Sequence, residues 1–462
     1  MEFYEYIDSL KEKRIAVIGA GVSNLPLAKL LLEHGCTVTV CDRRTREAMG
    51  ETAEDLLQRG AALQLGEDYL EHLTGYDLIF RTPGILPLDR HLLEAVQAGV
   101  TLTSEMELFF RFCPCKTIAI TGSDGKTTTS TVISELLKAA GKTVHLGGNI
   151  GKPLLCELPT MKKTDICVLE LSSFQLHSMY CRPDVAVVTN VSPNHLDVHP
   201  DYADYIEAKK AIFLQQNPDC CLVLNADNEI TRDFHQEAKA KISFFSRKQA
   251  VENGAYYADG KIWHAANGQA EPVIDIDEIK LPGMHNVENY MAAYCAVQGL
   301  VSDEEFCRVA REFNGVAHRL ELIRIKDGVK YINDSIASSP TRTVAGLRAF
   351  KPVENLVLIL GGHDKHVPFD ELADEVCQRC KAVFLCGETA ETIAAAIKAS
   401  SYYTEALPLY IHEDWTENVL AASRYAQAGD TVLLSPACSS FDKFKNFAVR
   451  GDLFRKIVME LN

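Results

Sequence analysis

The chain has 462 residues, of which 47% are hydrophobic and 24% charged, and its formal net charge is −16. A chain of this length suits about three domains, each large enough to bury its own core. The acidic balance disfavours nucleic acid as a partner, because such binding depends on Lys and Arg side chains that neutralise phosphates.

The sequence carries no sign of a membrane or export segment. No apolar run reaches the roughly 20 residues that span a bilayer. The first stretch, "MEFYEYIDSLKEKRIAV", is acidic and amphipathic, which is not typical of a signal peptide. We therefore expect a soluble, cytoplasmic and monomeric protein whose partners are small molecules, with no membrane contact.

The first alternating run of strands and helices carries a glycine turn. The stretch "RIAVIGAGVSNLPLAKLLLEHGCTVTVCD" (14–42) predicts a strand, a glycine turn, a helix and a second strand that ends at Asp42. The turn "GAGVSN" (19–24) is similar to the dinucleotide fingerprint G-x-G-x-x-G, but Asn24 stands where the third Gly belongs. It predicts either a bare turn or a site for a nucleotide-like ligand. An alternative function, that of a nicotinamide-dependent dehydrogenase, would be supported by this motif alone.

A second glycine turn lies in "KTIAITGSDGKTTTSTVISELLKAAG" (116–141). A buried strand and an amphipathic helix flank the glycines, so backbone N–H groups and the helix dipole favour a phosphate there. Lys126 can neutralise phosphate oxygens, and the Thr127 hydroxyl can bind Mg²⁺. The usual loop has four residues between its first Gly and the Gly-Lys-Ser/Thr end, whereas only two residues separate Gly122 from Gly125. We interpret the stretch as a short subtype of the phosphate loop.

Apolar strands separated by helices continue along the chain and indicate parallel sheets covered on both faces. Residues 242–269 differ, because they alternate and turn like a small β meander. Domain boundaries are expected near "SEMELFFRFCPCK" and "NGVAHRLE", which gives domains at 1–104, 105–316 and 317–462. The predicted fold is α/β with three domains, each a mainly parallel sheet flanked by helices. The outer two are expected to be Rossmann-like, and the central one to resemble a P-loop ATPase.

Fifteen cysteines are scattered through apparent strands and helices. An odd number in such positions is typical of buried thiols in a reducing compartment, not of a disulfide framework. The C-x-x-C pair Cys377 and Cys380 lies in a stretch that predicts a helix, with no second Cys or His pair beside it. We expect this pair to serve packing, not metal binding or redox chemistry.

The phosphate loop "TGSDGKTT" (121–128) resembles that of the ATP-dependent amide ligases that build the peptidoglycan stem peptide, a loop that folylpolyglutamate synthetases share. The tail "LSPACSSFDKFKNFAVRG" (434–451) is similar to the D-glutamate-adding branch of this family. Another stem-peptide ligase or a folate ligase is the alternative, although a folate ligase needs no uridine-nucleotide domain at 1–104. Further motifs appear in the family's order: "GGNIG" (147–151), "LELSSFQL" (169–176), "NVSPNHLDVHP" (190–200), "YIEAKKAIF" (205–213), "GMHNVEN" (283–289), "AHRLE" (317–321) and "NDSIASSP" (333–340).

The resemblance implies an enzyme that forms an amide bond through an acyl phosphate. A carboxylate is a poor electrophile at neutral pH, and phosphorylation by ATP gives it a good leaving group for an incoming amine. Such a transfer depends mostly on positioning and charge neutralisation. The implied substrates are UDP-N-acetylmuramoyl-L-alanine, D-glutamate and ATP, with two Mg²⁺ ions, and the implied by-products are ADP and phosphate.

The residues that the resemblance implies to be catalytic are Lys126, Glu170, His195 and Lys209. Glu170 ends an apolar strand, so it is expected to hold Mg²⁺ with Thr127, unless it caps a helix or forms a salt bridge. His195 is implied to bind a second Mg²⁺. Together with Asp197 and His199 it could instead suggest a zinc site, although no further cluster completes a tetrahedron.

The lysine pair in "EAKK" has two interpretations. From the pattern alone, Lys209 is a solvated helix lysine. The resemblance implies instead that it is carbamylated and acts as a metal ligand, which requires a neutral amine that burial could favour. Lys210 is the neighbour that could be mistaken for it. A regulatory nucleotide-binding module without turnover is the remaining alternative, and Glu170, His195 and Lys209 in register disfavour it.

The resemblance also implies which residues bind each substrate. ATP is assigned to Gly122, Ser123, Asp124, Gly125, Lys126, Thr127, Thr128, Asn286, Asn289, Arg319 and Asp334. The UDP-substrate is assigned to Val22, Ser23, Asp42, Arg44, Thr82, Gly84, Asn149 and Ser172, so the imperfect fingerprint would bind a diphosphate but not a dinucleotide. D-Glutamate is assigned to Ser338, Lys365, Ser440 and Phe447, and the metal ions to Thr127, Glu170, His195 and carbamylated Lys209.

The chain departs from the family pattern at 333–340. Many relatives have N-D-S-K-A-T-N, whereas this chain has Ile336 where that lysine stands and Ser338 in place of Thr. One cationic group near the γ-phosphate or D-glutamate is therefore missing. Either a neighbour such as Lys443 substitutes for it, or the affinity is lower.

Overall fold

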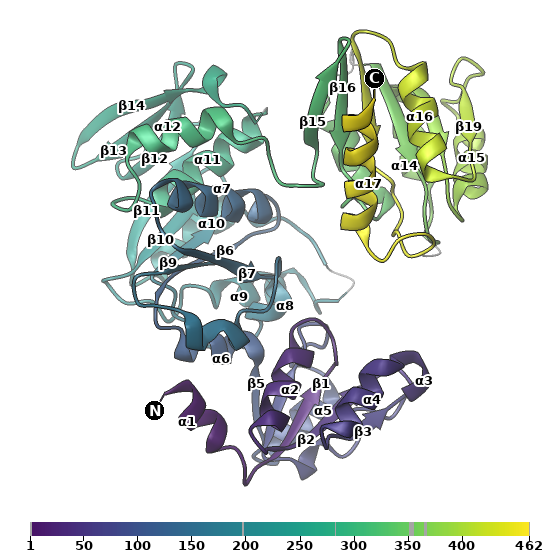
Figure 1. Cartoon of the computed structure of the whole chain (residues 1–462). Coiled ribbons are helices and arrows are strands. Elements are labelled where there is room, and N and C mark those ends of the chain that lie inside the picture. Colours follow the sequence, from purple (N-terminus) through teal and green to yellow (C-terminus); the bar gives the residue numbers. More distant parts are fainter. Residues whose placement is uncertain (1, 196–197, 282, 351–354, 365–366, 462) are drawn as a thin grey trace. The chain divides into compact units, whose positions relative to one another are not determined.

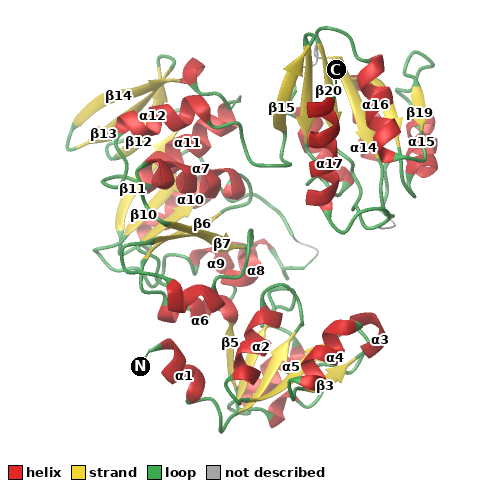
Figure 2. Cartoon of the chain, in the orientation of Figure 1, coloured by secondary structure: helices red, strands yellow, loops and turns green. Residues whose placement is uncertain are grey.

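The computed structural model of the chain describes residues 2–195, 198–281, 283–350, 355–364 and 367–461 (Figure 1). Contacts between residues divide the chain into two compact units, Met1–Phe313 and Asn314–Asn462. Three sheets, each flanked by helices, confirm the predicted α/β fold class (Figure 2). Within the described ranges, none of the helices has both the length and the apolar character that crossing a bilayer requires.

The first sheet is parallel throughout, with strand order β3-β2-β1-β4-β5. Alternate residues of β1 pack into different clusters, with Ile15 and Val17 in one and Ala16 and Ile18 in the other. The strand order reverses between β1 and β4, and such a switch point opens a crevice at the carboxyl ends of the strands. The elements are α1 (Phe3–Asp8), β1 (Arg14–Ile18), α2 (Asn24–Glu33), β2 (Thr37–Asp42), α3 (Arg46–Met49), α4 (Glu51–Gln58), β3 (Ala62–Leu65), η1 (Leu73–Gly75), β4 (Leu78–Arg81), α5 (Arg90–Gln97) and β5 (Thr101–Ser104).

The second sheet has nine strands in the order β14-β13-β12-β11-β10-β9-β6-β8-β7. The small meander expected at 242–269 is confirmed only in part: β11 pairs in parallel with β10, and β12 with β11, so that the antiparallel pairing is confined to β12, β13 and β14. These strands extend the central sheet. Its elements are α6 (Glu105–Phe112), β6 (Lys116–Thr121), α7 (Lys126–Ala139), β7 (Val144–Gly148), η2 (Leu155–Thr160), β8 (Ile166–Glu170), α8 (Ser173–Leu176), β9 (Val185–Val188), α9 (Tyr202–Lys210), β10 (Cys221–Asn225), α10 (Glu229–Asp233), η3 (Phe234–Gln236), β11 (Lys241–Ser246), β12 (Gly254–Ala258), β13 (Lys261–Ala266), β14 (Gln269–Asp275), η4 (Ile276–Glu278), α11 (Met284–Ala296) and α12 (Asp303–Glu312).

The third sheet belongs to the second unit and has the order β15-β16-β20-β17-β18-β19. Only β15 runs antiparallel to its neighbour. The predicted helix across the C-x-x-C pair ends at Arg379, and Cys380 begins β18 instead. The elements are β15 (Glu321–Lys326), β16 (Val329–Asn333), α13 (Pro340–Arg348), β17 (Asn355–Leu360), α14 (Asp370–Arg379), β18 (Cys380–Leu385), α15 (Ala390–Ala399), β19 (Leu409–Ile411), α16 (Trp415–Tyr425), β20 (Asp430–Leu434) and α17 (Phe447–Glu460).

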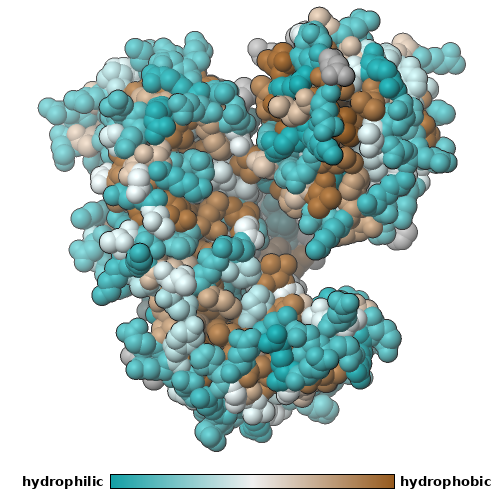
Figure 3. Space-filling view, viewed as in Figure 1, coloured by the Kyte–Doolittle hydropathy of each residue, from teal (hydrophilic) through white to brown (hydrophobic). Residues whose placement is uncertain are grey.

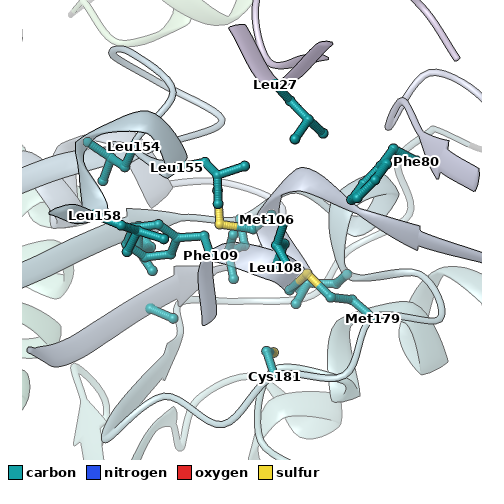
Figure 4. Packing of buried hydrophobic residues seen from close by; sticks show 14 of the residues in the cluster. Leu27, Phe80, Met106, Leu108, Phe109, Leu154, Leu155, Leu158, Met179 and Cys181 are labelled. Atoms are coloured by element: carbon teal, nitrogen blue, oxygen red, sulfur yellow. The ribbon is translucent and has the colours of Figure 1, made fainter. Parts of the chain in front are cut away.

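One buried cluster spans the first two sheets. Met106, Leu108 and Phe109 of α6 belong to the same cluster as Leu27 of α2 and Phe80 of β4 (Figure 4). Helix α6 also packs on η2 of the middle domain. Burial of apolar surface stabilises by about 25 cal/mol per Å², so this shared core holds the two domains together.

On the face in Figure 3, hydrophilic residues predominate over the region of α3 and α4 at the lower right.

A buried arginine joins the same two domains by hydrogen bonds. Arg81, the last residue of β4, donates to the carbonyls of Phe174 (3.0 Å) and His177 (2.6 Å) at the end of α8. It also donates to Gln175 O at 3.4 Å. Burial lowers the pKa of Arg81 to about 10, so the guanidinium stays charged at neutral pH and satisfies carbonyls that a helix end leaves without partners.

We predict that Arg81→Met destabilises the first unit by about 2 kcal/mol or more, because hydrogen bonds from a charged donor contribute about 1.5–3 kcal/mol each. The measurement is urea unfolding followed by Trp263 fluorescence in a Trp415→Phe background. Arg90→Met is the matched control, because Arg90 is exposed and its ion pair with Glu94 is long, at 3.7 Å. Equal losses in the two variants would contradict the bridging role of Arg81.

Candidate active site

The phosphate loop lies between β6 and α7, as the sequence predicts, and two of its glycines are obligatory. Gly122 has φ +148° and Gly125 has φ +79°, both unfavourable for other residues. A Cβ at Gly122 would lie 1.9 Å from Thr189 Oγ1, and one at Gly125 would lie 2.4 Å from Asn289 Oδ1. Neighbouring polar groups therefore approach the loop backbone where a side chain would stand.

The end of β9 fixes the loop through contacts that the sequence did not suggest. Ser123 N donates to Asn190 O at 2.9 Å, and Asp124 N donates to Asn190 Oδ1 at 2.9 Å. Thr189 Oγ1 donates to Asp124 O at 2.6 Å. Because β9 pairs with β6, the two residues that follow this strand hold the loop rigidly at the carboxyl end of the sheet.

Two lysines donate to one carbonyl of the loop. Lys126 Nζ lies 2.8 Å from Gly122 O and 2.9 Å from Ser123 O, and Lys209 Nζ lies 2.9 Å from Gly122 O. Lys209 is only 1% exposed, and its ammonium lies 4.5 Å from the centre of the Tyr205 ring. Burial, and then the charge of Lys126, lower the pKa of Lys209 well below its usual value. The two adjacent lysines therefore have different environments, because Lys210 forms ion pairs with Glu207 and Glu237.

Glu170 lies on the strand next to the loop. It ends β8, where it pairs with Ile120 of β6, and it is 2% exposed. Its Oε1 accepts a hydrogen bond from Asn149 Nδ2 at 3.0 Å. Its Oε2 is buried and has no hydrogen-bond partner among the described residues. A buried carboxylate oxygen is costly without a partner, so this atom fits a bound cation.

His195 lies on the loop after β9, in a left-handed conformation with φ +56° that a non-glycine residue rarely adopts. Its ring meets Phe174 edge-on at 5.0 Å. His199, a residue of the zinc alternative, has both ring nitrogens engaged: Nδ1 lies 2.6 Å from Asp204 Oδ2 and Nε2 lies 3.0 Å from Ser173 Oγ. Asp197, the remaining residue of that alternative, lies outside the described residues.

His199 belongs to a separate polar cluster that the sequence did not reveal. Asp204 accepts from His199 and, at 2.9 Å, from His177. Burial alone would raise the pKa of Asp204, but the hydrogen bonds from the two histidines outweigh it and lower the pKa. Phe174 stacks on His199 at 5.2 Å, so this cluster supports the loop that carries His195.

The expected adenine and substrate contacts of the middle domain also lie near the loop. Asn289 on α11 accepts from Thr129 Oγ1 of α7 at 3.3 Å and donates to Asn286 Oδ1 at 3.2 Å. Ser172 caps the N-terminus of α8 through Gln175 N at 3.2 Å. Thr127 and Thr128 occupy the first turn of α7 and are buried.

The residues expected to bind the uridine diphosphate follow strands of the first sheet. Asp42 ends β2 and accepts from Ala20 N at 2.8 Å, and Arg44 Nη2 donates to Asp42 Oδ2 at 2.8 Å. Burial alone would raise the pKa of Asp42, but hydrogen bonds from Arg44 and from backbone N–H groups outweigh burial and lower the pKa to about 2. Asn24, in place of the third glycine, donates to Ile18 O at 2.8 Å and so closes the turn. The remaining expected residues are Val22 and Ser23 after β1 and Thr82 and Gly84 after β4.

In the second unit, Asp334 follows β16 and faces the end of β20. Its Oδ2 accepts from Ser435 Oγ at 2.7 Å, and its Oδ1 accepts from Leu320 N at 3.2 Å. Burial raises the pKa of Asp334 to about 7, against the opposing hydrogen bonds from Ser435 and Leu320 and the charges of Arg319 and Arg342. The charge of Arg319 thus opposes the rise in the pKa of Asp334, the other residue of this unit that is expected to contact ATP.

An arginine that the sequence did not suggest holds segments that carry residues expected to bind D-glutamate. Arg450 is 1% exposed and donates to Ser335 Oγ (3.1 Å) and to the carbonyls of Ser335, Cys438 and Ser439 (3.0–3.2 Å). It thereby joins the segments that carry Ser338 and Ser440. Phe447 begins α17, and its carbonyl accepts from Ser335 Oγ at 2.8 Å. Lys365 lies outside the described residues.

Lys443 and Arg342 are two cations to consider at the departure at Ile336. Lys443 Nζ donates to Glu413 O. Arg342 on α13 instead donates to Ile336 O at 3.4 Å. Of these two residues, Arg342 is the one that donates a hydrogen bond to Ile336.

Comparisons with known proteins agree with this geometry. Three families match successive parts of the chain: the Mur ligase MurD-like N-terminal domain (residues 13–104), the Mur ligase middle domain (120–297) and the Mur ligase glutamate ligase domain (318–438). The UDP-N-acetylmuramoylalanine–D-glutamate ligases of Clostridium novyi and Clostridium perfringens are 47% and 48% identical to it, each over 99% of both chains. The structure of UDP-N-acetylmuramate-alanine ligase from Thermotoga maritima has the same fold, with a TM-score of 0.57 at 17% identity over 97% of this chain and 99% of that one.

The fold and the matches define an ATP-dependent ligase that forms amide bonds. The chain belongs to the Mur ligase family.

We predict that Lys209→Met lowers the rate of ADP release by about 100-fold or more, the loss expected when a preorganised charge at a transferring group is removed. Lys210→Met is the matched control and should retain activity within about twofold, because its ion pairs are with the exposed Glu207 and Glu237 and pairs with solvated partners contribute little. The measurement is a coupled ADP-release assay with saturating substrates. Similar losses in both variants would show that Lys209 has no special part in the reaction.

Proposed function

We propose that the protein joins D-glutamate to UDP-N-acetylmuramoyl-L-alanine while ATP is cleaved to ADP and phosphate. The observation that carries this proposal is the near-50% identity, over almost the whole chain, to two enzymes named for this reaction. We place the reaction in the cytoplasm, as a step in peptidoglycan precursor synthesis by a monomer. The domains at 1–104, 105–316 and 317–462 would bind the uridine nucleotide, ATP and D-glutamate, respectively.

The first step is phosphoryl transfer. The phosphate loop would bind ATP, and Lys126 would exchange the Gly122 and Ser123 carbonyls for phosphate oxygens. A carboxylate oxygen of the substrate's L-alanine attacks the γ-phosphorus, and the bond from that phosphorus to the oxygen retained by ADP breaks. Rigid loop contacts at Thr189 and Asn190 support this step, because positioning and charge neutralisation dominate such transfers.

The second step forms the amide. The amine of D-glutamate attacks the acyl carbon, and the tetrahedral intermediate collapses as the bond from carbon to the phosphate oxygen breaks. Phosphate leaves with that oxygen, and the amine loses a proton. Ser338, Lys365, Ser440 and Phe447 would orient the amino acid, and the Arg450 hydrogen bonds to neighbouring backbone would keep their segments in place.

The metal assignment is part of the proposal. The buried Glu170 Oε2 without a partner among the described residues fits a cation, and Thr127, His195 and carbamylated Lys209 would complete the sites for two Mg²⁺ ions. The ions would neutralise phosphate charge during transfer. Carbamylation needs a neutral amine, and the lowered pKa of Lys209 favours that form.

We predict that ADP release requires UDP-N-acetylmuramoyl-L-alanine and D-glutamate together. The assay compares D-glutamate with L-glutamate, L-lysine and diaminopimelate, and uses a folate acceptor as a further arm. Amide product identified by mass spectrometry separates ligation from simple ATP hydrolysis. Turnover with L-lysine, diaminopimelate or the folate acceptor, and none with D-glutamate, would overturn the substrate assignment.

A further inference from the structure

Three cysteines far apart in the sequence converge at the amino-terminal end of the central sheet. Cys113 and Cys115 lie in the segment that joins α6 to β6, and Cys167 is the second residue of β8. Their sulfur atoms are 3.5 Å (113–115), 3.3 Å (115–167) and 3.7 Å (113–167) apart. Within the described ranges, no other set of three thiols comes this close.

The sheet register creates this convergence. Strands β6 and β8 pair in parallel with Thr117 opposite Cys167, which brings Cys167 beside the residues that precede β6. Cys115 is 7% and Cys167 0% exposed, whereas Cys113 is half-buried. The Met161 thioether lies 3.8 Å from Cys167 Sγ, so a fourth sulfur atom borders the cluster, and the half-buried Cys113 is the most exposed of the three thiols.

We propose that Cys113, Cys115 and Cys167 form a binding site for one thiophilic divalent cation of the Zn²⁺ and Cd²⁺ type. Zinc–thiolate bonds of about 2.3 Å place the sulfur atoms of a tetrahedral site about 3.8 Å apart, so the observed separations need only a small expansion. Binding replaces the S–H protons, which pass to solvent, and forms three metal–sulfur bonds without any change of oxidation state.

The site is separate from the proposed chemistry. Cys167 lies three residues before Glu170 on β8, so a rise of about 3.3 Å per residue places it about 10 Å from that carboxylate. Side chains alternate along a strand, so Cys167 and Glu170 point to opposite faces. A cation here would tie the segment after α6 to β8, and its effect would be on the stability of the first unit.

The test is Cd²⁺ titration of the full-length protein under anaerobic, reducing conditions, followed by the ultraviolet charge-transfer band of Cd–thiolate bonds. We expect saturation at one Cd²⁺ per chain, displacement by Zn²⁺ and a higher unfolding temperature. This band does not arise from nitrogen or oxygen ligands, so binding at His177, His199 and Asp204 cannot imitate it.

The double variant Cys113→Ser/Cys115→Ser should lose the band, with affinity lowered beyond the roughly 100-fold that loss of an outer-shell partner costs. The matched control is Cys377→Ser/Cys380→Ser, which removes the sequence's own C-x-x-C pair and should keep the band. Cys167→Ala provides a second test if the first variant folds poorly. No band in the parent protein, or equal loss in the control, would overturn the proposal.

Discussion

The carbonyl of Gly122 accepts from two lysines at once, and the rest of the candidate site depends on this interaction. Lys126 comes from the helix that follows the loop, and Lys209 comes from α9, 87 positions from Gly122. Two ammonium groups on one carbonyl repel each other, which helps to lower the pKa of Lys209. The positive charge of Lys126 favours an anion at this site, and in a chain of net charge −16 that preference has to be created locally.

The fold supplies that local environment through strand order. Strand β6 lies between β8 and β9, so the loop after β6 lies between Glu170 and the Thr189–Asn190 pair. Glu170 brings a carboxylate oxygen without a partner among the described residues, and Thr189 and Asn190 bring hydrogen bonds that hold the backbone. Phosphoryl transfer to a carboxylate must bring two anions together, and Lys126 and the proposed cations supply the opposing charge.

Much of this arrangement could be predicted from the sequence where the signal is local. The strand–glycine–helix pattern placed the phosphate loop and the first-sheet turn correctly, and the apolar strands gave the fold class. The burial of Lys209 could not be predicted from "EAKK", because a distant carbonyl distinguishes it from Lys210. For the same reason Arg81 and Arg450 were missed: each is fixed by carbonyls of segments remote in sequence. The cysteine pattern drew notice to Cys377 and Cys380, whereas the convergent thiols depend on the register of β6 and β8.

The central claim is that the substrate's carboxylate accepts the γ-phosphoryl group before the amine attacks. It is tested most directly with UDP-N-acetylmuramoyl-L-alanine carrying ¹⁸O in the alanine carboxylate, turned over with ATP and D-glutamate. Mass analysis of the released inorganic phosphate should find one ¹⁸O atom per molecule, transferred from the carboxylate. Phosphate that carries no label would contradict an acyl phosphate, because neither carboxylate oxygen would then have passed to phosphorus.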